Sequence, residues 1–317
     1  NKNKYLSTNV YTKKNNIINN TYIKLIQKLK FYMKLTNNII RKYLNNYPLL
    51  EYRLKQNREQ LFILQLYKIA KKHTQIILIE IGSSDLKENI ILTKILNKTK
   101  ITSVIYEASK ETYTKLIKKR EKNKLNNLYI VNKAIIPDEK TYYLRESNEK
   151  NLNRIVSQNI ERTTAINDKN ILRFDEIQEL YTPNIHKIIK MDIEGLEESI
   201  LTKNSKLLSQ LINISLCIEL HQQSYKNPKK LKESILYLIE NKFRIKFIEF
   251  SMYSNKLILK KYKKNNNLIA KNNKRYLIKN PNTEIIDHIV NCDYQIIKQA
   301  PFYSPKNIRS VTLHKDR

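Results

Sequence analysis

Short apolar runs alternate with amphipathic segments between Gln75 and Ser251. The runs are rich in β-branched residues and are apolar on both faces, which is typical of strands covered by helices on each side. The predicted strands are Ile76–Ile81, Ile101–Tyr106, Leu128–Asn132, Lys187–Asp192, Ile214–Glu219 and Phe243–Ser251. The predicted helices are Glu88–Leu96, Glu111–Asn123, Pro228–Asn241 and one that begins near Glu197. The alternation predicts an α/β fold built from βαβ units around a mainly parallel sheet.

The two ends of the chain differ from this central region. Residues 1–20 are polar with little periodicity, whereas Thr21–Lys72 has helical spacing with helices predicted at Asn37–Tyr47 and Arg58–Lys72. From Tyr262 onward the pattern fades into basic stretches, with one short strand predicted at Arg275–Ile278. We therefore expect a basic helical N-terminal extension (1–72), an α/β domain (73–262) and a basic C-terminal extension (263–317).

The net charge of +31, from 60 Lys and Arg against 29 Asp and Glu, favours a polyanionic partner. Nucleic acid is the first expectation and an anionic membrane surface the second. For RNA, we expect lysines of both extensions on phosphates and Tyr262 and Tyr276 stacked on unpaired bases. A very AT-rich coding sequence would also raise Lys and Asn, and it would account for only 2 Gly and no Trp. Both explanations stay open. No apolar run of 18 residues lacks a charge, so the sequence predicts no transmembrane helix.

The loop after the first predicted strand reads EIGSSDLKEN, with Gly82 directly after Glu80-Ile81. Ligands of open α/β sheets bind at the carboxyl ends of strands, where a glycine lets the backbone approach a ligand closely. The loop lacks the further glycines of a dinucleotide fingerprint, which argues against NAD. Glu107 ends the second strand about 25 residues later, close to the spacing at which an acid meets a ribose diol. Taken alone, Gly82 also suits a tight turn, and Glu107 suits a helix N-terminus.

The segment HKIIKMDIEGLEESIL delivers two carboxylates, Asp192 and Glu194, just past the end of an apolar strand. Glu197 and Glu198 follow in the first turn of a helix, where acids are stabilising through capping and the helix dipole. Capping explains Asp192 less well, because this residue still belongs to the strand end. We therefore expect Asp192 and Glu194 at the rim of the sheet, beside the ligand crevice.

The segment IIKMDIEGLEESIL resembles the signature of the FkbM-type methyltransferases, an apolar-Lys-apolar-Asp-apolar-Glu-Gly pattern. Other landmarks fall in the same order as in that family. EIGSS resembles its first cofactor loop, VIYEAS its second, KLNNLYIVNKAI its third strand and loop, LRFDEI the segment before the signature, and LCIELH the strand that closes the site. The resemblance spans about residues 75 to 250 and leaves both ends unexplained.

The resemblance implies a Rossmann-like sheet of seven mostly parallel strands, S-adenosylmethionine as cofactor and O-methyl transfer. The cofactor-binding positions that it implies are Glu80, Gly82, Ser84, Glu107 and Ala134. Methyl transfer to a hydroxyl needs an aligned acceptor and a base, and the candidates for that base are Asp192, Glu194 and His221. His221 also suits a surface histidine at a strand end. The sequence predicts no metal site.

The chain departs from the family pattern in its first loop. Glu80 stands where the family has Asp, and Leu86 stands where it has a further glycine. We expect the side chains of Ser84, Asp85 and Leu86 to crowd the methionine end of the cofactor, which favours loss of binding. The leading hypothesis is a degenerate methyltransferase domain kept as an RNA-associated subunit of a ribonucleoprotein, such as a mitochondrial ribosome with its rRNA. The expected location is then the mitochondrial matrix. The alternative is an active S-adenosylmethionine-dependent O-methyltransferase acting on a sugar, lipid or RNA hydroxyl.

Overall fold

The structure, a computed structural model, describes part of the chain in ten segments. They are 61–83, 85–95, 100–138, 140–145, 154–156, 163–251, 268–272, 275–281, 286–290 and 308–316. The chain divides into two units, Asn1–Glu51 and Tyr52–Arg317, and every described residue belongs to the second. The predicted helix Asn37–Tyr47 and most lysines of the N-terminal extension lie outside the described residues.

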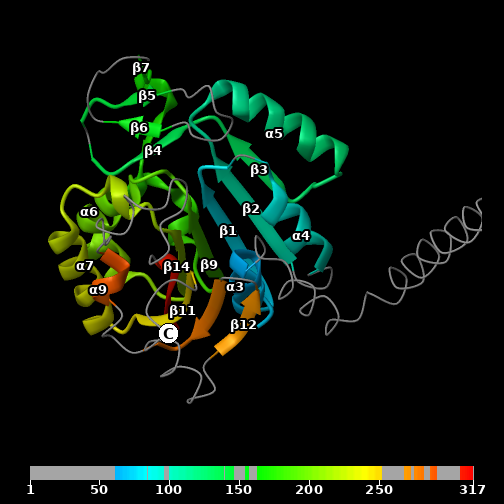
Figure 1. The fold of residues 1–317 in the computed structure, drawn as a ribbon. Helices are drawn as coiled ribbons and strands as arrows, with labels where there is room; N and C mark the ends of the chain where they lie inside the picture. The colour runs from blue at the N-terminus through cyan, green and yellow to red at the C-terminus, as the bar shows by residue number, and fades with distance from the viewer. Residues whose placement is uncertain are drawn as a thin grey trace, which may run out of the picture. The chain divides into compact units, whose positions relative to one another are not determined.

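A nine-stranded sheet forms the centre of the second unit, in the order β12-β13-β11-β14-β10-β9-β1-β2-β3 (Figure 1). One half is parallel and contains β1 (Gln75–Ile81), β2 (Lys100–Tyr106), β3 (Leu128–Val131), β9 (His186–Met191) and β10 (Ile214–Glu219). The other half pairs antiparallel through β11 (Arg244–Ser251), β12 (Leu268–Asn272), β13 (Arg275–Lys279) and β14 (Ile308–Lys315). The predicted Rossmann-like α/β fold is confirmed, but the sheet is mixed and has more strands than the seven expected.

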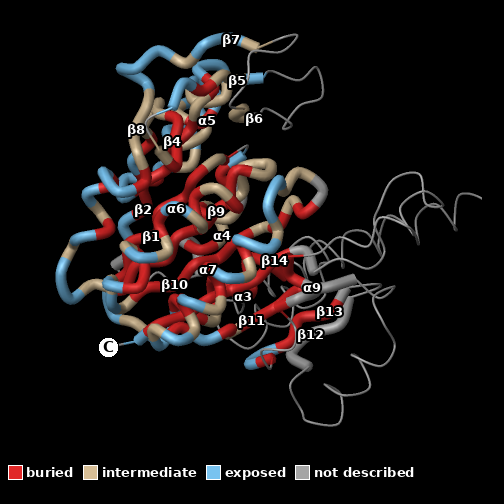
Figure 2. The backbone as a smooth tube through the Cα atoms, turned by 90° about the vertical axis from the view of Figure 1, so that its left-hand side faces the viewer, coloured by how far each residue is buried: buried red, intermediate tan, exposed pale blue. Residues whose placement is uncertain are grey.

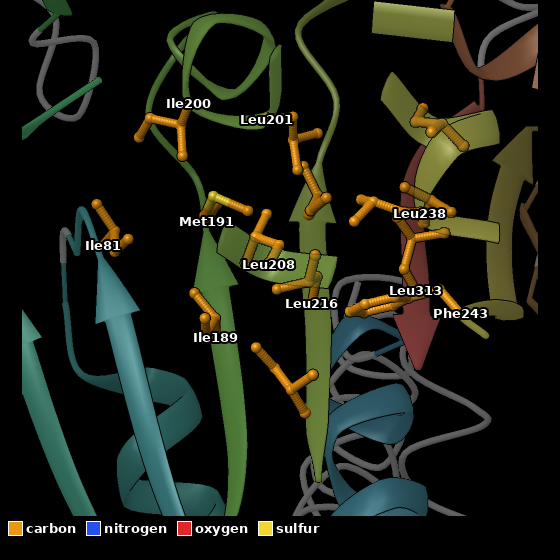
Figure 3. Close-up of a cluster of buried hydrophobic side chains, with 14 of the residues drawn as sticks. Ile81, Ile189, Met191, Ile200, Leu201, Leu208, Leu216, Leu238, Phe243 and Leu313 are labelled. Carbon is orange, nitrogen blue, oxygen red and sulfur yellow. The ribbon is translucent and has the colours of Figure 1, made fainter. Parts of the chain in front are cut away.

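Helices cover both faces of this sheet (Figure 1). On one face lie α6 (Glu197–Gln210), α7 (Pro228–Glu240) and α9 (Ile286–Val290), and on the other lie α3 (Leu61–Ala70), α4 (Lys87–Ile95) and α5 (Lys110–Lys122). The alternation of side chains along each strand separates the two layers. In β2, Val104 and Tyr106 join the main core with α6 and α7, whereas Ile105 packs with Leu116 of α5. Figure 3 shows part of the main core, where Ile189 and Leu216 of neighbouring strands lie near Leu208 of α6.

The C-terminal strand β14 corrects the prediction of a C-terminal extension, because it lies inside the sheet between β10 and β11. Val311 and Leu313 face the main core, while Ser310 and Thr312 face α3. Gln65 of α3 satisfies both hydroxyls: its Nε2 donates to Ser310 Oγ (2.8 Å) and its Oε1 accepts from Thr312 Oγ1 (2.8 Å). The buried polar face of β14 is therefore paired, as burial of hydroxyls requires.

The neighbouring strand β13 overturns a second expectation for this region. Tyr276 is only 3% exposed and packs in the main core. The prediction that its ring stacks on unpaired bases is therefore wrong. Tyr262, the other tyrosine of that prediction, lies outside the described residues.

A small insertion interrupts the parallel half of the sheet, between β3 and β9 in the chain. β4 (Ala134–Ile136) and β8 (Ile171–Arg173) pair in parallel, and β5 (Tyr143–Arg145) pairs antiparallel with both β6 (Arg154–Val156) and β7 (Thr163–Ala165). Short 3-10 turns complete the fold at Asp168–Asn170, Phe174–Glu176, Gln178–Tyr181 and Gln222–Ser224. The insertion packs on the loop after β9 through Ile136, Tyr142 and Leu196. Figure 2 shows its outer strand β7 largely exposed, in contrast to the buried central strands.

No helix in the described part of the chain combines the length and apolar character that a membrane span requires.

The position of β14 predicts how substitutions in the C-terminal region affect stability. Leu313 is fully buried, so Leu313→Ala should lower the free energy of unfolding by about 2–5 kcal/mol through lost contacts and a cavity. Ile212→Ala, at a side chain that is 47% exposed, should change it by no more than about 0.5 kcal/mol. Denaturant titration of both variants measures the difference. Equal, small effects would show that residues 308–315 do not form an internal strand.

Candidate active site

Three predicted site residues meet at the carboxyl edge of the sheet. β1 pairs in parallel with β2 on one side and with β9 on the other, so the three strands end at the same edge. Two backbone bonds continue these pairings past the strand ends: Gly82 N donates to Tyr106 O (3.0 Å), and Asp192 N donates to Ile81 O (3.2 Å). Gly82, Glu107 and Asp192 thus stand side by side, as predicted from the order of the strands.

Both glycines of the chain lie at this edge, and each is required by its surroundings. Gly82 has φ +75°, and a Cβ there would lie 2.5 Å from the carbonyl oxygen of Asp192. Gly195 has φ +112°, and a Cβ there would lie 2.4 Å from Cβ of Ser224. Any side chain at Gly82 would clash with the backbone of Asp192, so this glycine is needed for loop packing as well as for the turn. The two glycines let the loops after β1 and β9 pack more closely than any side chain would permit.

One of the three side chains expected to crowd the cofactor, that of Leu86, lies in the interior of the protein. Leu86 keeps a left-handed backbone (φ +56°), but its side chain is fully buried and packs with Ile105 and Leu116. The expectation that Leu86 crowds the cofactor is therefore wrong. The backbone conformation costs about 1–2 kcal/mol for a residue with a Cβ, and burial of the leucine side chain offsets this cost. Ser84 lies outside the described residues.

Glu107, at the end of β2, has a carboxylate held in one orientation. Its Oε2 accepts from Ser83 N (3.2 Å) and its Oε1 accepts from Ser109 N (2.8 Å). Burial raises the pKa of Glu107 to about 7, against the lowering effect of these two backbone hydrogen bonds. Each carboxylate oxygen has a second lone pair, so the group can still accept hydrogen bonds from two hydroxyls of a ligand.

Glu80 lies beneath the edge, with both of its oxygens bonded within the protein. It is fully buried; Oε1 accepts from Lys190 Nζ (2.7 Å) and Oε2 from Asn89 Nδ2 (2.5 Å). Burial disfavours the ammonium of Lys190, but the carboxylates of Glu80, Glu88 and Asp192 outweigh this and raise its pKa well above the usual value. The structure thus gives Glu80 a role in joining β1 to β9.

Ala134, another predicted cofactor residue, is 1% exposed at the start of β4, where it pairs with Ile171. Its side chain is part of the packed interior of the insertion.

The three candidate base residues, Asp192, Glu194 and His221, lie close together on the loops after β9 and β10. His221 Nε2 is 3.6 Å from Glu194 Oε2 and 3.9 Å from Asp192 Oδ1. The imidazole is 13% exposed, so the hypothesis of a surface histidine is wrong. Its Nδ1–H donates to Glu197 Oε1 at 2.6 Å.

The protonation of His221 separates the roles of these groups. Burial lowers the pKa of His221, but the hydrogen bond and charge of Glu197, with the charges of Glu194 and Asp192, raise it to about 9. The ring is therefore an imidazolium near neutral pH. The two carboxylates are the better proton acceptors.

Glu197 and Glu198 have more specific partners than helix capping predicted. Glu197 is fully buried and accepts from His221 and from Ile193 N (3.2 Å). Glu198 accepts from the backbone N–H groups of Lys226 and Asn227. Sequence reasoning missed Glu197 as part of the site, and its only signal was its place three residues after Glu194.

A cavity of about 420 Å³ opens beside this cluster. It lies between the start of α6 and the small insertion, with Glu194 and Gly195 on one wall and Tyr142 and Ile155 on another. Lys203 also lines it and lies 3.6 Å from Asp138. Clefts of roughly 300–1,000 Å³ accommodate small-molecule ligands.

Solved structures with a related fold include several methyltransferases. The FkbM methyltransferase of Methylobacillus flagellatus KT is 12% identical, with 64% of this chain and 54% of that chain covered at a TM-score of 0.34. An rRNA methylase from Streptococcus thermophilus is 10% identical, with 83% of this chain and 98% of that chain covered at a TM-score of 0.37. An O-methyltransferase from Bacillus cereus, solved in complex with SAH, is 12% identical, with 68% of this chain and 90% of that chain covered at a TM-score of 0.33. No curated protein matches the chain.

The family itself is shown by a sequence profile. The profile of the methyltransferase FkbM domain matches residues 70–245, more than half of the chain. The matched region runs from the end of α3 into β11 and contains Gly82, Glu107, Asp192 and His221. The chain belongs to the FkbM methyltransferase domain family.

Proposed function

We propose that this protein is an S-adenosylmethionine-dependent O-methyltransferase. The observation that carries the proposal is the convergence, at one sheet edge, of carboxylates on two different loops that suit two different roles. Glu107 offers an oriented carboxylate after β2, and Asp192 and Glu194 offer proton acceptors after β9. Membership of the FkbM family supports the same activity.

The residues around Gly82 fit the nucleoside part of this cofactor. The absence of a side chain at Gly82 keeps the loop against Asp192, and Leu86 points away into the core. Glu107 would accept hydrogen bonds from the two ribose hydroxyls, because its carboxylate is already oriented by Ser83 and Ser109. When bound, S-adenosylmethionine supplies a methyl group activated by its sulfonium.

The cavity beside Glu194 would hold the methyl acceptor. A hydroxyl placed there lies next to the carboxylate of Glu194, which lines the cavity and would receive its proton. The imidazolium of His221 holds a positive charge between the carboxylates of Glu194 and Asp192, so it orients them and does not compete for the proton. The acceptor class most consistent with this polar cavity is a small hydroxylated molecule or the exposed hydroxyl of a larger one.

Binding of the cofactor tests the proposal. Calorimetric titration of the full chain with S-adenosylmethionine should give one site, and Glu107→Ala should weaken it by about 1–3 kcal/mol because two ligand hydroxyls lose their acceptor. The matched control is Glu121→Ala, on the exposed side of α5. A wild-type protein that binds no cofactor, or a Glu107→Ala protein that binds as well as wild type, would contradict the proposal.

A second proposal, association with RNA, is supported by the surface of α5. This helix carries six basic residues, Lys110, Lys115, Lys118, Lys119, Arg120 and Lys122, against the two acidic residues Glu111 and Glu121. Its apolar side packs inward around Leu116, and four of the basic residues, Lys110, Lys115, Lys118 and Lys122, are exposed. An RNA-associated protein subunit of an organellar ribonucleoprotein would use such a face, and so would an enzyme that methylates RNA.

Charge substitutions test the RNA proposal without disturbing the sheet, whereas truncation of the C-terminal region would remove β14. Replacing Lys110, Lys118 and Lys122 by Gln should weaken RNA binding. The slope of log binding constant against log salt concentration should become shallower by up to about 2, because each lost phosphate contact removes about 0.7 from it. Gln at Lys206, Lys229 and Lys230, on α6 and α7, is the matched control. Identical salt titrations for the two triple variants would contradict a specific role for α5.

A further inference from the structure

We propose that Asp192, Glu194 and His221 bind a divalent metal ion beside the cavity that Glu194 lines. Three ligand atoms, one from each residue, all lie within 4.8 Å of one another. The proposal concerns the same edge as the proposed methyl transfer. Only its suggested role depends on that function; the site itself stands on the geometry.

The side-chain atoms of the cluster are too far apart to hydrogen-bond to one another, but they are spaced as ligands of one metal ion would be. His221 Nε2 is 3.6 Å from Glu194 Oε2 and 3.9 Å from Asp192 Oδ1, and neither separation is a hydrogen bond. Ligand atoms that each lie about 2.0–2.6 Å from one ion stand about 3–5 Å apart. The three side chains therefore surround a point that an ion can reach with small adjustments.

A buried carboxylate behind His221 provides the second observation. Glu197 is fully buried, and its Oε1 accepts from His221 Nδ1 at 2.6 Å. Its other oxygen, Oε2, has no hydrogen-bond partner within the described part of the chain. A histidine that binds a metal through one nitrogen usually donates its other N–H to a carboxylate, which fixes the ring and leaves the first nitrogen as the ligand. Glu197 holds Nε2 towards Asp192 and Glu194 in this way.

The local charge also favours a cation. The chain as a whole carries +31, yet Asp192, Glu194 and Glu197 gather around one imidazole. The ammonium of Lys190 lies 3.9 Å from Asp192 Oδ2, and its charge is already matched by Glu80 at 2.7 Å. When an ion binds, the proton on His221 Nε2 is released to solvent, so a +2 ion replaces a +1 imidazolium between the carboxylates.

One imidazole and two carboxylates form a ligand set that suits Zn²⁺ or Mn²⁺ better than Ca²⁺ or Cu⁺. Three protein ligands leave positions open for water or for oxygen atoms of another molecule. Glu194 lines the cavity, so those positions face the space proposed for the acceptor. A bound ion would orient an acceptor hydroxyl and lower its pKa.

Titration of the full-length protein with MnCl₂ and, separately, with ZnCl₂ tests the site, with any histidine tag removed and no cofactor present. One ion should bind per chain. Asp192→Asn and Glu194→Gln should each weaken binding at least tenfold, and Glu197→Gln should weaken it about 10–100-fold through the lost orientation of His221. His73→Ala and Asp168→Asn, which remove the same chemical groups elsewhere, should bind like wild type.

A wild-type protein without a site for either ion, or isosteric Asp192→Asn and Glu194→Gln proteins that bind as wild type does, would overturn the proposal. Thermal unfolding of each variant without metal separates loss of the site from loss of the fold. Cofactor titration of the same samples separates the two proposals. Cofactor binding without metal binding overturns only the metal site, and metal binding without cofactor binding supports the site while contradicting methyl transfer.

Discussion

The buried ion pair between Glu80 and Lys190 is the interaction on which the candidate site depends. These residues face each other in the register of β1 and β9, two positions before Gly82 and Asp192. Both side chains are almost completely enclosed, so removal of either partner would leave an uncompensated charge in the interior, at a cost of about 3–5 kcal/mol. The pair therefore fixes the relative position of the two strands whose ends carry the first loop and the acidic loop.

The site above this pair combines close backbone packing with concentrated negative charge. The only glycines of the chain, Gly82 and Gly195, are both needed for that packing, one against Asp192 and the other against Ser224. Each position therefore needs glycine for steric reasons, in a chain that has no other glycine. The carboxylates also gather here, in a chain with twice as many basic as acidic residues.

The sequence predicted the parallel half of the fold well because its strands are continuous apolar runs. β1, β2, β9 and β10 each coincide with a predicted run to within one residue at either end, and the order of these runs placed Gly82, Glu107 and Asp192 at one edge. By contrast, β14 escaped notice because only alternate residues, such as Val311 and Leu313, are apolar. Its polar residues Ser310 and Thr312 look like a surface segment until Gln65 of α3 is seen to satisfy them.

Predictions from local sequence were also wrong or incomplete where the direction of a side chain in the fold determines its role. Leu86 occupies a position that favours glycine, but its side chain is buried with Ile105 and Leu116 and does not crowd the loop. Glu197 looked like an ordinary acid in a first helical turn, and only the fold brings it to His221, on the loop after β10. Cooperation between residues far apart in the chain cannot be read from the spacing within either segment.

The most direct measurement of the central claim compares two ligands in two proteins. The ligands are S-adenosylhomocysteine, the demethylated form of the proposed cofactor, and its analogue without the two ribose hydroxyls; the proteins are wild type and Glu107→Ala. If Glu107 receives those hydroxyls, their removal should weaken binding at least tenfold in wild type and have almost no effect in the variant, because interacting groups are coupled. An equal loss of affinity in both proteins, or no loss in either, would contradict the assignment of this edge as the cofactor site.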